Sequence, residues 1–200
     1  MSSGRASGQL ALTGLDGAPV PTDRLFFALY PDASAAARIA QLAQRLRGEL
    51  RLRGRPLQTE RFHVTLHHLG DYAGLPADVL RCAKQAAAAI AVPPFEIAFD
   101  RAMSFDRKPS NRPFVLQGSG EGLAGVLAFQ QALGEALKNA GLGRWVAPRF
   151  TPHVTLLYDD RRVDEEAIEP IRWTVREFVL VDSLLGRTQH VPLERWPLGS

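Results

Sequence analysis

Apolar positions follow two kinds of pattern along this chain. Alternation of apolar and polar residues is typical of half-buried strands, whereas apolar residues at every third or fourth position are typical of amphipathic helices. Helical spacing predicts three main helices, which begin at Asp32, at Pro76 and near Leu123. Strands are predicted, in chain order, at about 24–30, 63–70, 95–99, 114–117, 152–158, 173–180 and 191–196, with one brief helix at 164–168.

The order of these elements indicates an internal duplication. A strand, a helix and a second strand follow one another near 24–70 and again near 114–158. With 200 residues, the chain can form one compact unit or two closely joined lobes. We therefore expect an α+β architecture for residues 23–200. Residues 1–22 are rich in Gly, Ser and Pro without a hydrophobic stretch, so we expect a flexible tail and not a signal peptide.

One phrase occurs in both halves: His63-Val64-Thr65-Leu66 recurs as His153-Val154-Thr155-Leu156. In a strand, alternate side chains point to opposite faces, so each phrase presents an imidazole and a hydroxyl together and an apolar pair behind them. A single strand histidine is more often a partly buried polar residue. Two identical copies at matching positions favour a function, and paired imidazoles suit acid–base chemistry near neutral pH.

With the opening segment Arg24 to Pro31, these two phrases make the sequence resemble the 2H phosphoesterases, over residues 24–198. Within them it is most similar to the bacterial RNA 2',3'-cyclic phosphodiesterases, also called 2'-5' RNA ligases. The resemblance implies a duplicated bilobal fold, in which two mostly antiparallel sheets with outer helices flank a central groove. It implies metal-independent hydrolysis of 2',3'-cyclic phosphodiesters on RNA ends or nucleotides to 2'-phosphates, with 2'-5' ligation as a possible reverse reaction.

Four residues are the candidate site. His63 and His153 would transfer protons to and from the reacting oxygens, and the hydroxyls of Thr65 and Thr155 would bind the charged phosphate oxygens of the substrate. The resemblance favours His153 as the base and His63 as the acid. This scheme uses no metal and no cofactor.

Strict strand alternation places two further histidines. His67 would lie on the face of His63, where it would line the end of the groove or serve as the third ligand that a catalytic zinc site usually has. His68 would point with Leu66 into the core. The groove position is favoured over the metal because neither phrase has a familiar ligand spacing.

Several residues depart from the family pattern or remain open. Relatives often carry an arginine shortly after the second phrase, where this chain has Tyr158; Arg149 or Arg161 could compensate. His190 lies where relatives often have a tyrosine, and it either borders the groove or is structural. The aromatic side chains that could stack on a base are Phe26, Tyr30 and Phe62.

Composition adds little to this interpretation. A net charge of +3 permits binding to phosphates without requiring it. Arginines gather between positions 45 and 61, either as a solvated surface or as a patch that attracts phosphate. The single cysteine, Cys82, excludes an intrachain disulfide and suits a reducing compartment, and no apolar run reaches membrane-spanning length. We expect a cytoplasmic protein, monomeric and without a membrane partner.

Other functions fit the same motifs. The chain could act on 2'-5' oligoadenylate or on the cyclic phosphate of ADP-ribose. It could also be an RNA-binding module that has lost turnover, although the intact histidine and threonine in both phrases argue against this.

Overall fold

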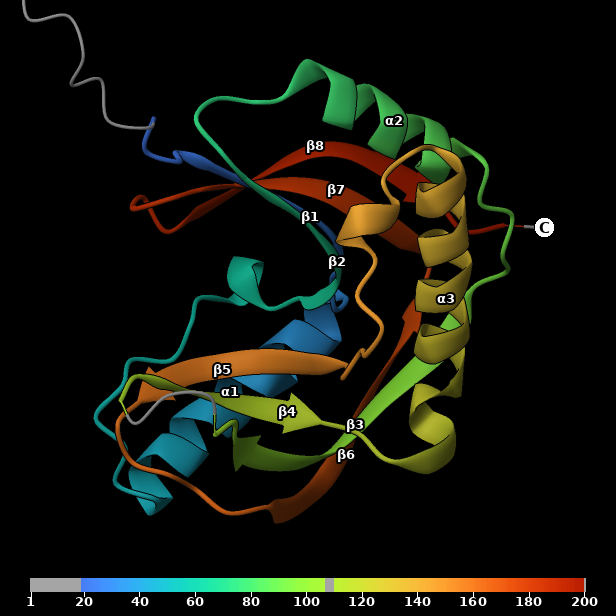
Figure 1. Cartoon of the computed structure of the whole chain (residues 1–200). Coiled ribbons are helices and arrows are strands. Elements are labelled where there is room, and N and C mark those ends of the chain that lie inside the picture. Colours follow the sequence, from blue (N-terminus) through green and yellow to red (C-terminus); the bar gives the residue numbers. More distant parts are fainter. Residues whose placement is uncertain (1–18, 107–109, 200) are drawn as a thin grey trace, which may run out of the picture.

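Two four-stranded antiparallel sheets form the frame of the computed structural model, which describes residues 19–106 and 110–199. Most of the predicted tail, residues 1–18, lies outside the described residues. Sheet A has the order β2-β1-β7-β8 and sheet B the order β5-β4-β3-β6 (Figure 1). Their bounds are β1 Asp23–Leu29, β2 Val64–Tyr72, β7 Glu177–Leu184 and β8 Gln189–Pro197, then β3 Phe95–Ser104, β4 Arg112–Gln117, β5 His153–Asp159 and β6 Glu166–Val175.

The helices connect the two sheets. The first, α1 (Ala33–Glu49), begins as predicted at Asp32, whose carboxylate accepts a hydrogen bond from the Ala35 amide at 2.8 Å. It follows β1 of sheet A in the chain but packs on β5 and β6 of sheet B. The other two, α2 (Ala77–Ala88) and α3 (Ala124–Asn139), pack on each other, and α3 contacts β2 of sheet A and β3 of sheet B (Figure 1).

The main apolar core extends through both sheets, and a smaller cluster of Phe26, Ala28, Val179 and Val181 lies beside it. Phe27 on β1 and Phe178 on β7 lie with ring centroids 5.9 Å apart, and Phe178 packs edge-on against Phe129 of α3 at 5.1 Å. Phe129 in turn contacts Phe95 of β3 at 5.5 Å. Because these rings link sheet A to sheet B through one helix, the sheets are held in a fixed relation. The α+β fold with two antiparallel sheets is confirmed.

The brief helix predicted at 164–168 is wrong. Residues 166–175 form β6, an edge strand paired with β3, and its inward side chains Ile171, Trp173 and Val175 alternate with exposed residues. The charged start of the segment resembles a helical turn in sequence, but its polar residues lie at the outer edge of sheet B, where an edge strand also tolerates Pro170. The single strand predicted at 173–180 is two strands, because the chain leaves sheet B at the end of β6 and continues in sheet A as β7.

None of the helices within residues 19–106 and 110–199 is long and apolar enough to cross a membrane.

Candidate active site

The two repeated phrases occupy the same structural position in the two sheets. They lie on β2 and β5, each of which is an edge strand of its sheet. Thr65 pairs with Ala28 on β1, and Thr155 pairs with Val115 on β4. In both strands the following leucine, Leu66 or Leu156, has no partner in the register, because a β-bulge occurs at that residue. The duplication therefore includes the irregularity as well as the motif.

His63 and His153 are anchored in the same way. The Nδ1 atom of His63 lies 2.7 Å from the carbonyl oxygen of Arg61, and Nδ1 of His153 lies 2.8 Å from that of Thr151. A carbonyl oxygen can only accept, so each Nδ1 carries a hydrogen and the neutral ring keeps its other nitrogen, Nε2, as a proton acceptor. The structure brings the two rings close enough for the charge of His153 to lower the pKa of His63.

His63 lies in an aromatic setting. Its ring centroid is 5.1 Å from that of Phe26, 6.0 Å from that of Tyr30 and 5.0 Å from that of His190. Burial is the main reason that its pKa falls to about 4; the hydrogen bond to Arg61 opposes this shift, and the charges of His190, His153 and Arg61 reinforce it. At neutral pH the unliganded protein therefore holds His63 neutral, which suits a base better than the acid that the resemblance favours.

His153 is half-buried and packs edge-on against Phe105, with ring centroids 4.8 Å apart. Phe105 follows β3, and the sequence does not predict it as a site residue. Its sequence context gives no signal, because a phenylalanine at the end of an alternating strand is usually part of the core. Each catalytic candidate thus has an aromatic ring beside it, Phe26 for His63 and Phe105 for His153.

Thr65 and Thr155 lie half-buried, as predicted, on the faces of β2 and β5 opposite the core. Thr65 shares a face with Phe26, which contacts His63, because Ala28 and Phe26 are two residues apart on β1. Within the described parts of the chain, neither threonine hydroxyl has a hydrogen-bond partner. Both hydroxyls are thus available to a ligand.

The predicted orientations of His67 and His68 are wrong. His67 is only 2% exposed and its Nε2 lies 2.9 Å from the carbonyl oxygen of Gln130 in α3, so it faces the core and not the groove. His68 is exposed, and its Nε2 lies 3.0 Å from Oδ1 of Asp71. The cause is the bulge at Leu66, which reverses the alternation for the residues after it. His67 is therefore excluded as a third metal ligand beside His63.

No group of three or more His, Cys, Asp or Glu side chains among the described residues is arranged to hold a metal ion.

Tyr158 occupies, on β5, the position that His68 occupies on β2, since they pair with Pro113 and Phe26 at equivalent places in the register. Its side chain is exposed, and with Arg51, Arg53 and Arg161 it lines a cavity of about 480 Å³. Arg161 itself donates to the carbonyl oxygen of Leu50 at 2.9 Å. Arg149 lies exposed in the segment before β5.

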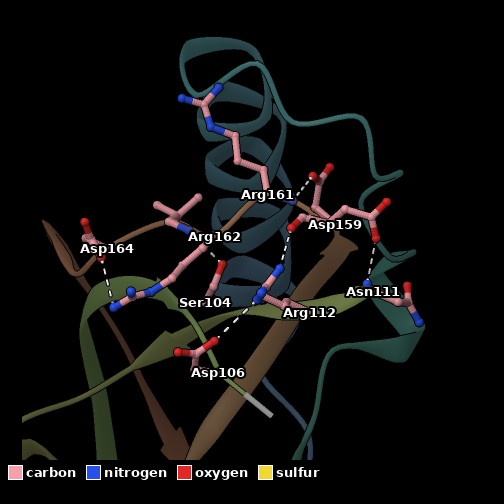
Figure 2. Close-up of polar contacts among 10 residues, drawn as sticks. Ser104, Asp106, Asn111, Arg112, Asp159, Arg161, Arg162 and Asp164 are labelled. Atoms are coloured by element: carbon pink, nitrogen blue, oxygen red, sulfur yellow. Dashed lines mark hydrogen bonds and ion pairs between the residues drawn. The ribbon is translucent and has the colours of Figure 1, made fainter. Parts of the chain in front are cut away.

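The end of β5 is fixed by Asp159. Its carboxylate accepts hydrogen bonds from the backbone amides of Arg53 at 2.5 Å, Gly54 at 2.7 Å and Arg161 at 2.8 Å (Figure 2 shows the last). Burial by itself would raise the Asp159 pKa, but these donors outweigh it and the pKa is lowered. Nearby, Arg112 donates to the carbonyl oxygen of Asp160 at 2.6 Å. These contacts hold β5, and with it the second phrase, in place.

The candidate stacking residues lie in three different environments. Phe62 is fully buried in the core and is excluded as a platform. Phe26 is buried beneath His63.

Tyr30 and His190 line a large cavity of about 1030 Å³ beside His63, so His190 borders the site. Burial raises the pKa of Tyr30 to about 12, and burial with the charge of Arg61 lowers the pKa of His190 to about 4.

Comparison with known proteins identifies relatives of this chain. The family model described as the 2'-5' RNA ligase superfamily matches residues 30–187. The crystal structure of E. coli LigT in apo form is 27% identical, with a TM-score of 0.69, and the alignment covers 90% of this chain and 100% of that one. A structure described as a phosphoesterase is also 27% identical, with a TM-score of 0.68 and the same coverage.

The protein TT0787 of Thermus thermophilus shares the fold at 22% identity, with a TM-score of 0.70 and coverage of 88% of this chain and 97% of that one. E. coli LigT has also been solved with phosphate, 3'-AMP, ATP and NADP+. No curated protein matches the chain.

Proposed function

The chain belongs to the 2'-5' RNA ligase superfamily, and we propose that it hydrolyses 2',3'-cyclic phosphodiesters on RNA ends or nucleotides to 2'-phosphates. The observation that carries the proposal is the pair of matching anchors: each imidazole donates its Nδ1 hydrogen to a carbonyl two residues earlier, and so presents Nε2 as the reactive atom. Two such atoms are the acid and the base that the reaction needs.

In the reaction, a water oxygen forms a bond to phosphorus while the bond from phosphorus to the ribose O3' breaks. The base takes a proton from the water, and the acid gives a proton to the departing O3', which leaves a 2'-phosphate and a 3'-hydroxyl. The low pKa of His63 favours it as the base in the free protein, and His153 is then the acid. Each transfer typically contributes ~10²–10⁴ in rate.

The hydroxyls of Thr65 and Thr155 donate to the non-bridging phosphate oxygens, whose charge grows in the transition state. Donors that are already in place stabilise that charge without a cost for reorienting at the moment of reaction. Each threonine lies two residues after its histidine, so proton transfer and charge stabilisation come from the same strand. Residues from both sheets thus act on one phosphate.

The test is turnover of a 2',3'-cyclic mononucleotide by the wild-type protein in excess EDTA, with the product identified by phosphorus NMR. We expect a 2'-phosphate as the product and no loss of rate on adding the chelator. A His63→Ala/His153→Ala double variant, purified identically, controls for contaminating activity. Absence of turnover, or a rate that the double variant retains, contradicts the proposal.

The same assay separates the alternatives. Turnover of 2'-5' oligoadenylate or of cyclic-phosphate ADP-ribose, with no turnover of the cyclic nucleotide, would identify a different substrate for the same type of reaction. RNA binding without turnover of any of them would identify a binding module.

A further inference from the structure

A large cavity lies to one side of the candidate active site. It adjoins His63, since two of its lining residues, Tyr30 and His190, contact the His63 ring and a third, Arg61, accepts the His63 hydrogen bond. Of the described residues that line it, none comes from β5. We call this cavity the β8 groove, because Gln189, His190, Pro192 and Arg195 of β8 form one wall. It is thus a space beside His63 whose lining includes neither His63 nor any residue of the second phrase.

The groove is long. Its lining runs along β8 from Gln189 to Arg195, a distance of roughly 20 Å at the rise of an extended strand. Its volume of about 1030 Å³ is at the upper limit of ordinary small-molecule pockets, which span ~300–1,000 Å³. An elongated space of this size beside the reacting group fits more than the single nucleotide that carries the cyclic phosphate.

The groove also offers arginines whose guanidinium groups make no ion pair with a described residue, although the charge of Arg187 contributes to lowering the pKa of Asp23. Arg61, Arg176 and Arg187 line it, and none of the three makes an ion pair or a side-chain hydrogen bond with another described residue. Of the acidic lining residues, Glu177 is paired with Arg195 and Asp32 caps α1, which leaves Glu60. Because a guanidinium donates two parallel hydrogen bonds to a phosphate, uncommitted arginines favour a phosphate ligand.

Arg187 is held in place by the hairpin between β7 and β8 (Figure 1). The Leu185 amide donates to the carbonyl oxygen of Thr22 at 2.8 Å, and the Arg187 amide donates to that of Leu184 at 3.1 Å. Gly186 takes the left-handed backbone conformation, with φ +77, that this tight turn requires. The hairpin therefore fixes the backbone of Arg187, which lines the groove together with Tyr30 and His190.

We propose that the β8 groove binds the RNA strand that precedes the cyclic phosphate, with backbone phosphates on Arg187 and Arg176 and a base against the ring of Tyr30. This rests on the proposed function. A 2',3'-cyclic phosphate lies at the 3' end of an RNA, so the remaining nucleotides all leave the site in one direction. Aromatic faces with arginines beside them are the usual way in which proteins hold single-stranded RNA. The preferred substrate is then an oligonucleotide and not a mononucleotide.

The first test compares kcat/KM for a 2',3'-cyclic mononucleotide with kcat/KM for a five-nucleotide RNA that ends in the same group. The wild type should prefer the oligonucleotide by ~10-fold or more at low salt. An Arg176→Gln/Arg187→Gln variant should lose most of that preference and keep its rate on the mononucleotide. Arg81→Gln removes an exposed arginine from α2, outside the groove, and should change neither value.

The second test measures binding and does not depend on turnover. The anisotropy of a fluorescent five-nucleotide RNA ending in a 2'-phosphate gives Kd as a function of salt. Loss of two phosphate contacts should make the slope of log Kd against log salt shallower by ~1.4, at ~0.7 per contact for a single strand. The Arg81→Gln slope should match the wild type.

The outcomes separate the two proposals. Equal kcat/KM for both substrates, or equal slopes for the wild type and the double variant, contradicts RNA binding in the β8 groove and leaves the proposed hydrolysis unaffected. If neither substrate is turned over but the slope is shallower in the double variant, the proposed hydrolysis is contradicted and RNA binding in the β8 groove is supported.

Discussion

Replacement of Asp182 by asparagine should stabilise the protein at neutral pH. Asp182 on β7 is 3% exposed and lies on the same face as Asp23 of β1, diagonally across the strand pair. Burial and the neighbouring Asp23 carboxylate raise the pKa of Asp182 to about 6. One of its oxygens, Oδ1, has no hydrogen-bond partner among the described residues. Asp23, in contrast, accepts hydrogen bonds from the Thr22 hydroxyl and the Gly74 amide, which leaves Asp182 as the member of the pair that holds a proton.

The size of the effect follows from the pKa difference between the folded and unfolded states. In the unfolded chain the pKa of an aspartate is ~4, so the folded state binds the Asp182 proton more tightly than the unfolded state does. This tighter binding stabilises the folded state at low pH, and the stabilisation is lost as the pH rises through about 6. A difference of ~2 in pKa corresponds to at most ~3 kcal/mol. The asparagine side chain carries no charge and can donate to Asp23, although its own burial offsets part of the gain. We therefore expect Asp182→Asn to add ~1–2 kcal/mol at pH 8 and almost nothing at pH 4.5.

Urea denaturation followed by tryptophan fluorescence at several pH values between 4.5 and 8 measures this difference. Asp164→Asn makes the same chemical change at an exposed site and should leave the pH dependence of the unfolding free energy unchanged. If Asp182→Asn destabilises the protein equally at pH 4.5 and pH 8, Asp182 is ionised and well solvated in the folded state, and the reasoning is refuted.

The remaining predictions concern the reaction. Thr65→Val and Thr155→Val keep the β-branched shape and delete the hydrogen-bond donor, so each should lower kcat by ~10²–10³ without loss of folding. An unchanged kcat in both variants would mean that the hydroxyls have a structural role and no catalytic one. If neutral His63 is the base, kcat/KM should hold through pH 5–6 and fall as the pH drops through about 4, where His63 becomes protonated; a rate that does not fall with acid contradicts this. A substrate with sulfur in place of O3' needs no protonation on departure. It should restore activity to His153→Ala far more than to His63→Ala, and the reverse result exchanges the two roles.

Much of the site could be predicted because its signals are local. The repeated phrase predicts which side chains share a face, and burial alternates over residues 63–66 and 153–156 as that prediction requires. The start of α1 followed from Asp32, whose side chain caps the helix. In each case the physical cause lies within a few residues of the effect, so one stretch of sequence contains it.

The parts that could not be predicted depend on residues far apart in the chain. The bulge at Leu66 arises from pairing with β1, and no local pattern signals it, so strict alternation assigns His67 and His68 to the wrong faces. The segment 164–168 is polar because it leads into the edge strand of sheet B. Its assignment as strand and not helix depends on its pairing with β3, which the local sequence does not reveal. Phe105 and His190 reach the site only when β3 and β8 are folded beside the motif strands.

The most direct test of the two-histidine mechanism is the turnover of a 2',3'-cyclic nucleotide by His63→Ala and His153→Ala, each measured in EDTA. Both histidines are only half-buried, so both variants should fold, which circular dichroism can verify. Each should lose at least ~10² in kcat, because each removes one proton transfer from the same step. A folded variant of either kind that keeps half of the wild-type rate contradicts the mechanism.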